Sequence, residues 1–593
     1  MNDEETKTTT SSAESVYFRM GSIHMRDGFE QSANDSRRYR AIRLKNDLTA
    51  LLISDKDAEK SGAALDVHVG HFSDPDELPG LAHFLEHMLF LGTKKYPDEN
   101  SYAEYLQSHG GSSNAYTACA HTNYQFDVTP PHLEEALDRF AQFFVCPLFT
   151  ASATDRELLA VDSENAKNLQ NDSWRLYQLT KSLSKKDHPF NSFGTGNLQT
   201  LKVIPEKSKI NTREALLAFH KKYYSANIMK LVVLGTDDLD TLQKWVEEKF
   251  VDIENKKIDF PSFPSDPFGD QILGKQINVL PVKDLRYIRM VFQLPPQKKN
   301  YGTQPCSYLS HLIGHEGKGS ILAYLKKQGW ASALMAGKST NEDCFATFNV
   351  TIELTENGLS HVDDCVECVF QYIAMLKTKG PQRWIYDEVT KVSAINVKYK
   401  SKSRTFSYVT GLAKSLHYYP NSEVLLGGNL LRKYDPKLIT ETLNLLNPKN
   451  MYIIFVSKNA INADDLCEAS EEKWYGTKYM DYSMKNIEEW TSPSRENKDL
   501  YMPEPNRFVA SDLSIRDVRG VRARSARILI ISLTHNYEQH CITHSCHCTL
   551  EYYEYCLYFD SLYFTFVRNE TLNSRFVLEH RYPMAQPKRH LPN

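Results

Sequence analysis

The five residues from His83 to His87 are of types that could do metal chemistry. The two histidines are four residues apart, and apolar residues on both sides predict a half-buried helix that carries both imidazoles on one face. Two imidazoles placed in this way can bind the same Zn²⁺ ion. Glu86 lies between them and can accept a proton from a water molecule whose pKa zinc lowers toward neutrality. The pattern predicts a hydrolytic zinc site, although a solvated helix face with a core histidine has the same pattern.

A third ligand is expected elsewhere in the chain, because catalytic zinc sites typically take three protein ligands and keep a fourth position open. The best candidates lie in the helical stretch 155–165, where Glu157 and Glu164 are two turns apart on one face. One of them can bind the metal while the other orients a ligand from outside. The residues alone leave open which carboxylate takes which role.

Five blocks of this sequence resemble, in the same order, the insulysin and nardilysin branch of the pitrilysin-type metallopeptidases. The first block, residues 80–93 followed by 96–100, has the order His-x-x-Glu-His of the inverted zincins. The other blocks resemble the edge strand and the third-ligand helix of that family, and they are residues 110–117, 121–124, 160–164 and 171–175. The resemblance runs from about residue 37 to about residue 510 and covers the N-terminal half of an insulysin-type chain.

The resemblance implies a zinc metalloendopeptidase that degrades short and medium peptides with one Zn²⁺ per chain. The matching residues are His83, His87 and Glu164 for the metal, Glu157 as an outer partner, Glu86 as general base, and Asn114, Ala115 and Tyr116 for the substrate. A non-catalytic, peptide-binding half-molecule is the alternative from a different class. A mitochondrial processing-peptidase-like subunit is a third reading, and the acidic N-terminus argues against it.

Composition fits an enzyme of several domains. A chain of 593 residues is too long for one hydrophobic core. Its 70 basic and 74 acidic side chains nearly balance, so the composition does not indicate binding to nucleic acid. No apolar run is long enough to span a membrane, so no membrane partner is expected. The polar, acidic start of the chain predicts a disordered lead over residues 1–36 and a cytoplasmic protein. The family resemblance leaves mitochondrial or peroxisomal locations open.

The second half of the chain repeats the pattern of the first half. His311 and His315 restore the histidine spacing, with Gly314 at the position of Glu86, and Glu388 and Ile395 echo Glu157 and Glu164. Strand-like runs at 228–234 and 451–456 repeat as well. We therefore expect an α+β fold of two tandem homologous pitrilysin-type domains, each a mixed sheet packed against helices. Their predicted limits are 37–260 for the catalytic domain and 270–500 for an inactive, peptide-binding domain. A second zinc site at His311 and His315 is the alternative, but it lacks a matching carboxylate.

In insulysin-like enzymes the corresponding part of the second copy captures the N-terminus of a substrate. The matching residues here are His311, Gly314, Glu316 and Leu334, and a carboxylate such as Glu316 suits an amino group. One family glycine is Ala336 in this chain. A tight turn at the end of a helix is the other explanation for the glycines near residue 314.

The resemblance ends near residue 512, and residues 513–593 form an atypical tail that we expect to be poorly ordered. Insulysin-like chains are about twice as long as the matching region and close a second half over the first like a clamshell. This sequence therefore predicts the N-terminal half of a clamshell, with weak activity alone. Its expected partners are peptide substrates and either a second copy of itself or a complementing C-terminal half.

Overall fold

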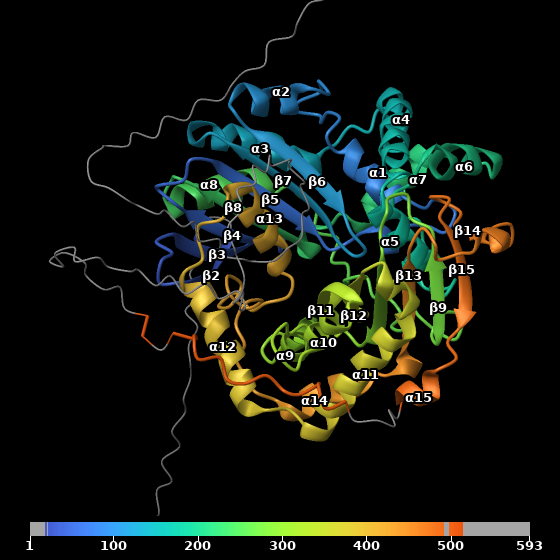
Figure 1. Ribbon diagram of the computed structural model, residues 1–593. Helices are drawn as coiled ribbons and strands as arrows, with labels where there is room; N and C mark the ends of the chain where they lie inside the picture. The colour runs from blue at the N-terminus through green and yellow to red at the C-terminus, as the bar shows by residue number, and fades with distance from the viewer. Residues whose placement is uncertain (1–17, 20–21, 492–496, 511, 514–593) are drawn as a thin grey trace, which may run out of the picture. The chain divides into compact units, whose positions relative to one another are not determined.

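Two mixed β-sheets organise the computed structural model, which describes residues 18–19, 22–491, 497–510 and 512–513 (Figure 1). The first sheet has the order β1-β2-β3-β4-β8-β5-β7-β6. Its strands are β1 (Phe18–Arg19), β2 (Ser22–Asp27), β3 (Arg38–Leu44), β4 (Thr49–Ser54), β5 (Ser61–Val67), β6 (Ser112–Thr117), β7 (Thr122–Val128) and β8 (Met229–Gly235). Strands β4 and β8 are parallel and the other neighbours are antiparallel.

The second sheet has the order β11-β12-β10-β13-β9-β15-β14. Its strands are β9 (Lys275–Val279), β10 (Tyr287–Leu294), β11 (Ala331–Asn341), β12 (Ala346–Leu354), β13 (Met451–Val456), β14 (Ser470–Glu471) and β15 (Lys478–Ser483). The five strands β9 to β13 are arranged as β9-β13-β10-β12-β11, which is the order of β4-β8-β5-β7-β6 in the first sheet, with the same directions. The predicted repeat is therefore present in the topology, and the two predicted strand runs are β8 and β13.

Helices surround both sheets. Those of the first half are α1 (Leu81–Met88), α2 (Ser101–Ser108), α3 (Leu133–Val145), α4 (Ala151–Asn168), α5 (Asp172–Ser182), α6 (Ile204–Lys207), α7 (Thr212–Tyr223) and α8 (Leu239–Phe250). Those of the second half are α9 (Pro305–Ile313), α10 (Ile321–Gln328), α11 (Val362–Lys379), α12 (Arg383–Lys398), α13 (Thr405–Ser415), α14 (Pro436–Leu445) and α15 (Ile487–Thr491). None of the described helices combines the length and apolar character that a bilayer span requires.

The first sheet is buried on both faces. Every residue of β4 and β5 is buried, as expected for short, nearly continuous apolar runs in a sheet covered on both sides. Helices α1, α3 and α8 pack on one face. The other face is covered by α13, which follows most of the second sheet in sequence and places Val409, Leu412 and Ala413 against Leu51 and Val232 (Figure 1).

The structure describes only parts of the predicted lead and of the predicted tail. Strand β2 pairs with β3, so residues 22–27, which lie inside the lead that the sequence predicts to be disordered, form part of the first sheet. The predicted tail lies outside the described residues from residue 514 onward. The described residues all belong to one compact unit, so the domain limits 37–260 and 270–500 stay predictions.

Candidate active site

Helix α1 carries His83 and His87 on its partly exposed face, as the sequence predicts. Its opposite face packs into the core of the first sheet. The helix begins after Gly80, whose φ of 93° favours glycine, and a Cβ there would lie 2.2 Å from Cα of Gly196. The carboxylate of Asp74 accepts hydrogen bonds from the backbone N–H groups of Gly80 and Ala82, at 2.7 and 2.8 Å, and fixes the start of the helix.

Hydrogen bonds set the orientation of both imidazoles. The Nδ1 atom of His83 lies 2.7 Å from the carbonyl oxygen of Thr195. Because a carbonyl only accepts, His83 must donate from Nδ1, and Nε2 is the nitrogen that it offers to a metal. In the same way, Nδ1 of His87 lies 2.7 Å from Oε1 of Glu157, and Nε2 of His87 faces Glu164.

Glu164 completes a group of three ligands. It lies on α4, whose first turn is capped by the Thr150 side chain. Its Oε2 atom is 3.7 Å from Nε2 of His83 and 3.5 Å from Nε2 of His87. Ligand atoms about 2.0 Å from one tetrahedral zinc ion are about 3.3 Å apart, so this donor set fits zinc closely. The predicted candidates His83, His87, Glu157 and Glu164 are thus brought together.

The electrostatics of the group favour positive charge. Burial by itself would lower the pKa of His87, but its hydrogen bonds with Glu157 and Glu164 outweigh burial and raise that pKa to about 10. The hydrogen bond from His87 lowers the pKa of Glu164. Two carboxylates beside two imidazoles form a donor set that suits a divalent cation.

Glu86 lies on α1 next to this group, and it is buried with 6% exposure. Its Oε2 accepts a hydrogen bond of 2.6 Å from the Thr117 hydroxyl. Burial raises its pKa, while His83 and Thr117 act in the opposite direction. A carboxylate with a raised pKa is a better proton acceptor, which suits a general base.

A cavity of about 700 Å³ opens over these side chains. Strand β6 forms one wall, and it is the terminal strand of its sheet, so one side of its backbone has no neighbouring strand among the described residues. The predicted substrate residues Asn114, Ala115 and Tyr116 all lie on β6 and line the cavity. An unpaired strand edge can add an extended peptide as a further strand.

Sequence reasoning missed several residues of this cavity. Thr117 and Thr195 contact Glu86 and His83, and Lys181, His71 and Glu342 also line it. The Nζ atom of Lys181 is 3.3 Å from Nε2 of His71, and burial lowers the pKa of Lys181 to about 8. Thr117 directly follows the predicted Tyr116, but the other residues come from distant segments, so no local spacing could have indicated them.

The four residues predicted to bind peptide in the second copy lie away from this cavity. His311 and Gly314 are at the end of α9, and Glu316 is exposed just after it. Leu334 lies on β11, but its side chain is buried in the core of the second sheet, so only its backbone could face a peptide. Among the described residues, the groups that could share a metal ion do not include His311 and His315.

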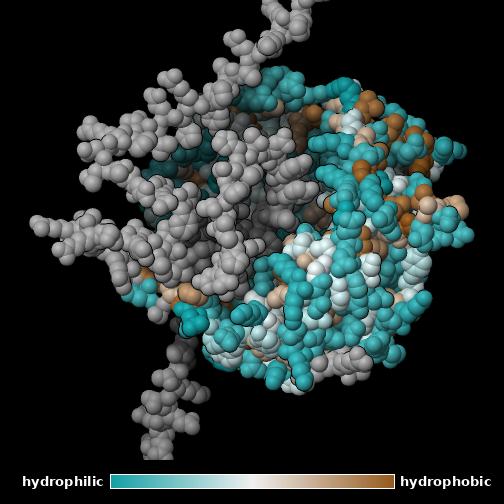
Figure 2. Space-filling model, in the orientation of Figure 1, coloured by the Kyte–Doolittle hydropathy of each residue, from teal (hydrophilic) through white to brown (hydrophobic). Residues whose placement is uncertain are grey.

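The surface is mostly hydrophilic on the face drawn in Figure 2, and its hydrophobic residues form small groups. No large apolar patch is visible among the described residues of that face. The cavity differs from this surface in composition, because both apolar and charged side chains line it around the histidines.

Sequence models of one peptidase family match most of the chain. The model described as Insulinase (Peptidase family M16) matches residues 49–187, the Peptidase M16 inactive domain matches residues 211–392, and the middle or third domain of peptidase M16 matches residues 398–537. The match therefore extends beyond residue 510, where the sequence resemblance was expected to end.

Individual relatives agree with the family models. The chain is 47% identical over 502 residues to the A-factor-processing enzyme of Saccharomyces cerevisiae and 45% identical over 487 residues to the insulin-degrading enzyme of Homo sapiens, which covers 84% and 82% of this chain. These matches cover only 48% and 47% of the two relatives, so the chain spans about half their length. The crystal structure of pitrilysin superposes with a TM-score of 0.79 at 30% identity, over 84% of this chain and 52% of pitrilysin.

Proposed function

Because the chain belongs to peptidase family M16, we propose that it is a zinc metalloendopeptidase of insulysin type that hydrolyses short and medium-sized peptides. The observation that carries this proposal is the convergence of three donor atoms on His83, His87 and Glu164 beside an edge strand. The insulysin-like relatives favour this reading over a mitochondrial processing-peptidase-like subunit.

In this proposal His83, His87 and Glu164 hold one Zn²⁺ ion. Bound zinc lowers the pKa of water toward neutrality and polarises a peptide carbonyl. Glu157 accepts the Nδ1–H of His87 and so keeps Nε2 of that ring directed at the metal position. The Thr195 carbonyl does the same for His83.

Glu86 acts as the general base. Its buried carboxylate takes the proton from the attacking water and later delivers it to the leaving amine. Thr117 keeps the carboxylate in place through the hydrogen bond to Oε2. The substrate lies extended along β6, where the backbone of Asn114 and Ala115 pairs with it and Tyr116 lines its path.

Metal content and peptide cleavage, measured together, test the metal assignment. We expect the purified chain to bind zinc and Glu164→Gln to lose most of it, because a ligand is removed. Glu157→Gln should weaken zinc binding by about 10- to 100-fold, the usual cost of losing an outer partner. Glu104→Gln, an exposed change on α2, is the matched control and should bind zinc as the parent does. Equal or inverted losses for Glu157 and Glu164 would exchange their roles.

A second candidate function follows from the length of the relatives, of which this chain covers about half. The chain could hold zinc and peptide without efficient turnover, as a peptide-binding half-molecule. Measured peptide affinity together with no detectable cleavage would favour this function over the first one.

A further inference from the structure

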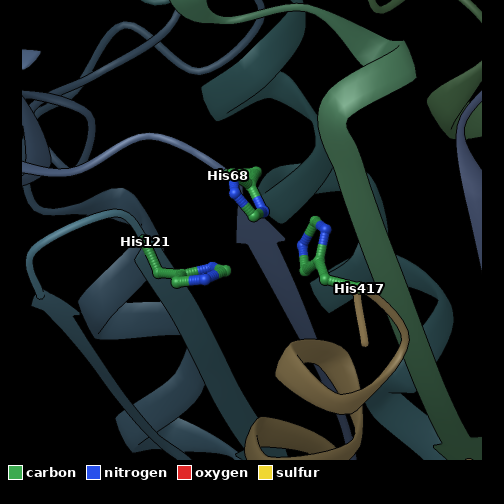
Figure 3. A group of neighbouring side chains, drawn as sticks. All are labelled: His68, His121 and His417. Atoms are coloured by element: carbon green, nitrogen blue, oxygen red, sulfur yellow. The ribbon is translucent and has the colours of Figure 1, made fainter. Parts of the chain in front are cut away.

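A second group of histidines lies apart from the candidate active site. His68 follows β5, His121 lies in the turn before β7, and His417 follows α13. Figure 3 shows the three rings pointing toward one another from these elements. One ligand atom from each ring lies within 4.8 Å of the other two, and the ring centroids are 4.5, 5.0 and 5.3 Å apart.

One nitrogen of each ring faces a carboxylate. Oδ1 of Asp66 lies 2.7 Å from Nδ1 of His121 and 3.1 Å from Nε2 of His417. Oδ2 of Asp343 lies 3.0 Å from Nε2 of His68. Histidines that bind metals almost always donate their other N–H to a carboxylate, a backbone carbonyl or a water molecule. Nδ1 of His121 has the Asp66 carboxylate in this role, and Nε2 of His417 lies 3.3 Å from the carbonyl oxygen of Asp66.

The remaining nitrogens point to a ligand. Nδ1 of His68 and Nδ1 of His417 are buried and have no hydrogen-bond partner among the described residues, and the His417 side chain is only 1% exposed. Nε2 of His121 contacts the hydroxyl of Tyr418. Two buried ring nitrogens without a hydrogen-bond partner in one cluster are unusual, because buried polar atoms in native proteins nearly always have one.

The charge state of the cluster also suits a cation. Oδ1 of the buried Asp66 carboxylate faces both the His121 and the His417 ring, which places an acidic group directly beside the cluster. Asp66 is fully buried and Asp343 lies at the edge of the cluster, where Lys298 binds its other oxygen at 2.9 Å. The carboxylate of Asp66 has no lysine or arginine partner among the described ion pairs.

We propose that His68, His121 and His417 bind a second divalent transition-metal ion of zinc-like ligand preference. Imidazole donors suit zinc, copper and nickel rather than magnesium or calcium. The donor atoms would have to approach from up to 4.8 Å to the roughly 3.3 Å that one tetrahedral zinc ion imposes. The ion would join the first sheet to the end of α13 and would stabilise that contact.

The test separates this site from the candidate active site. The full chain carrying both His83→Gln and His87→Gln lacks the α1 ligands, so its zinc content after dialysis reports other tight sites alone. We expect about one zinc ion per chain in this double variant and about two in the parent. Zinc should also raise its melting temperature. A double variant that retains no zinc would overturn the proposal, whatever the fate of the peptidase activity.

A further substitution identifies the ligands. Adding His417→Gln to the double variant should abolish the remaining zinc, whereas adding His361→Gln, at a partly exposed histidine on the second half, should leave it unchanged. If the His417 variant does not fold, X-ray absorption spectroscopy of zinc in the double variant still identifies the type and number of its ligands. Three imidazoles around the ion would support the site, and fewer than two would overturn it.

Discussion

Glu86 and Glu164 are carboxylates beside the same two imidazoles, and their surroundings give them different properties. Glu86 is buried and its pKa is raised by burial. The Glu164 side chain is 41% exposed, and the hydrogen bond from His87 lowers its pKa. The proposed proton acceptor and the proposed metal ligand are thus distinguished by their surroundings, since the two side chains are chemically identical.

Replacing Glu86 by Gln should abolish peptide cleavage without loss of zinc. The amide cannot accept a proton, while His83, His87 and Glu164 are untouched. General bases contribute about 10²- to 10⁴-fold to rate, so we expect a loss of that size in kcat. Cleavage of a quenched peptide and zinc analysis on the same sample measure both effects. Cleavage at the parental rate would show that Glu86 is not the base.

Histidine 220 should make the protein sensitive to mild acid. Burial, and then Lys256, lower its pKa from 6.5 to about 3, while its ring stacks on Tyr224 at 4.9 Å. The unfolded chain binds a proton below about pH 6.5 and the folded chain does not, so stability falls as the pH drops from there toward 3. The expected slope is about 1.4 kcal/mol per pH unit.

The substitution His220→Phe keeps the ring contacts and removes the proton site. Urea unfolding of parent and variant at pH 7 and pH 5 should therefore show a smaller loss of stability for the variant. An identical loss in both proteins would mean that titratable groups other than His220 cause the loss of stability between pH 7 and pH 5.

At the scale of elements, α13 packs on the central strands of the first sheet, where Val409, Leu412 and Ala413 join the cluster of Leu51, Ala64 and Val232. Gly411 lies inside this helix, and a Cβ at this position would meet nothing within 4 Å. Glycine inside a helix costs about 0.5–1 kcal/mol relative to alanine. Glycine therefore lowers the stability of α13, although the packing around residue 411 leaves room for an alanine side chain.

Replacing Gly411 by Ala should raise the free energy of unfolding by about 0.5–1 kcal/mol. The matched control is Gly70→Ala, whose Cβ would lie 2.1 Å from the Ala118 carbonyl oxygen and should destabilise the protein. Urea denaturation monitored by circular dichroism measures both changes. A destabilised Gly411 variant would mean that α13 does not hold the position described here.

Local sequence patterns predicted the helices that carry the site. They did not predict contacts between residues far apart in the sequence. Helical spacing indicated α1 and α4, and family resemblance distinguished Glu164 from Glu157 as the expected ligand. The position of α13 could not be predicted, because its apolar face fits any sheet. The same holds for His417, which joins His68 and His121 only after the chain has folded. Leu334 was assigned to substrate by family resemblance, and a resemblance does not reveal the direction of a strand side chain; the assignment stays a prediction.

For the whole molecule, the shared strand order of the two sheets indicates one architecture used twice. Only the first copy has all three candidate ligands, since the sequence repeat places Ile395 on α12 at the position of Glu164 on α4. The described residues carry the complete candidate metal site, but the match covers only 48% and 47% of the two relatives.

The isolated chain should therefore be a weak peptidase that still binds zinc. One lost transition-state donor commonly costs about 10²–10³ in rate, and residues of the longer relatives beyond the match could supply such donors. We expect cleavage of short peptides to rise when the C-terminal half of a full-length relative is added. An inactive half that is mixed with the chain under the same conditions serves as the control. Full activity that the added half leaves unchanged would contradict this expectation.

The covering of the first sheet by α13 also affects protein synthesis. Strand β8 and helix α8 complete the first sheet and one of its layers by residue 250, whereas the buried residues that cover the other face extend to Val424. At about 5–20 residues per second, roughly 10 to 30 s separate the two on the ribosome. During that time a sheet face bearing Leu51, Ile53 and Val232 is open to water. Chaperone binding by ribosome-bound chains should be strongest in this interval and should end once α13 has emerged.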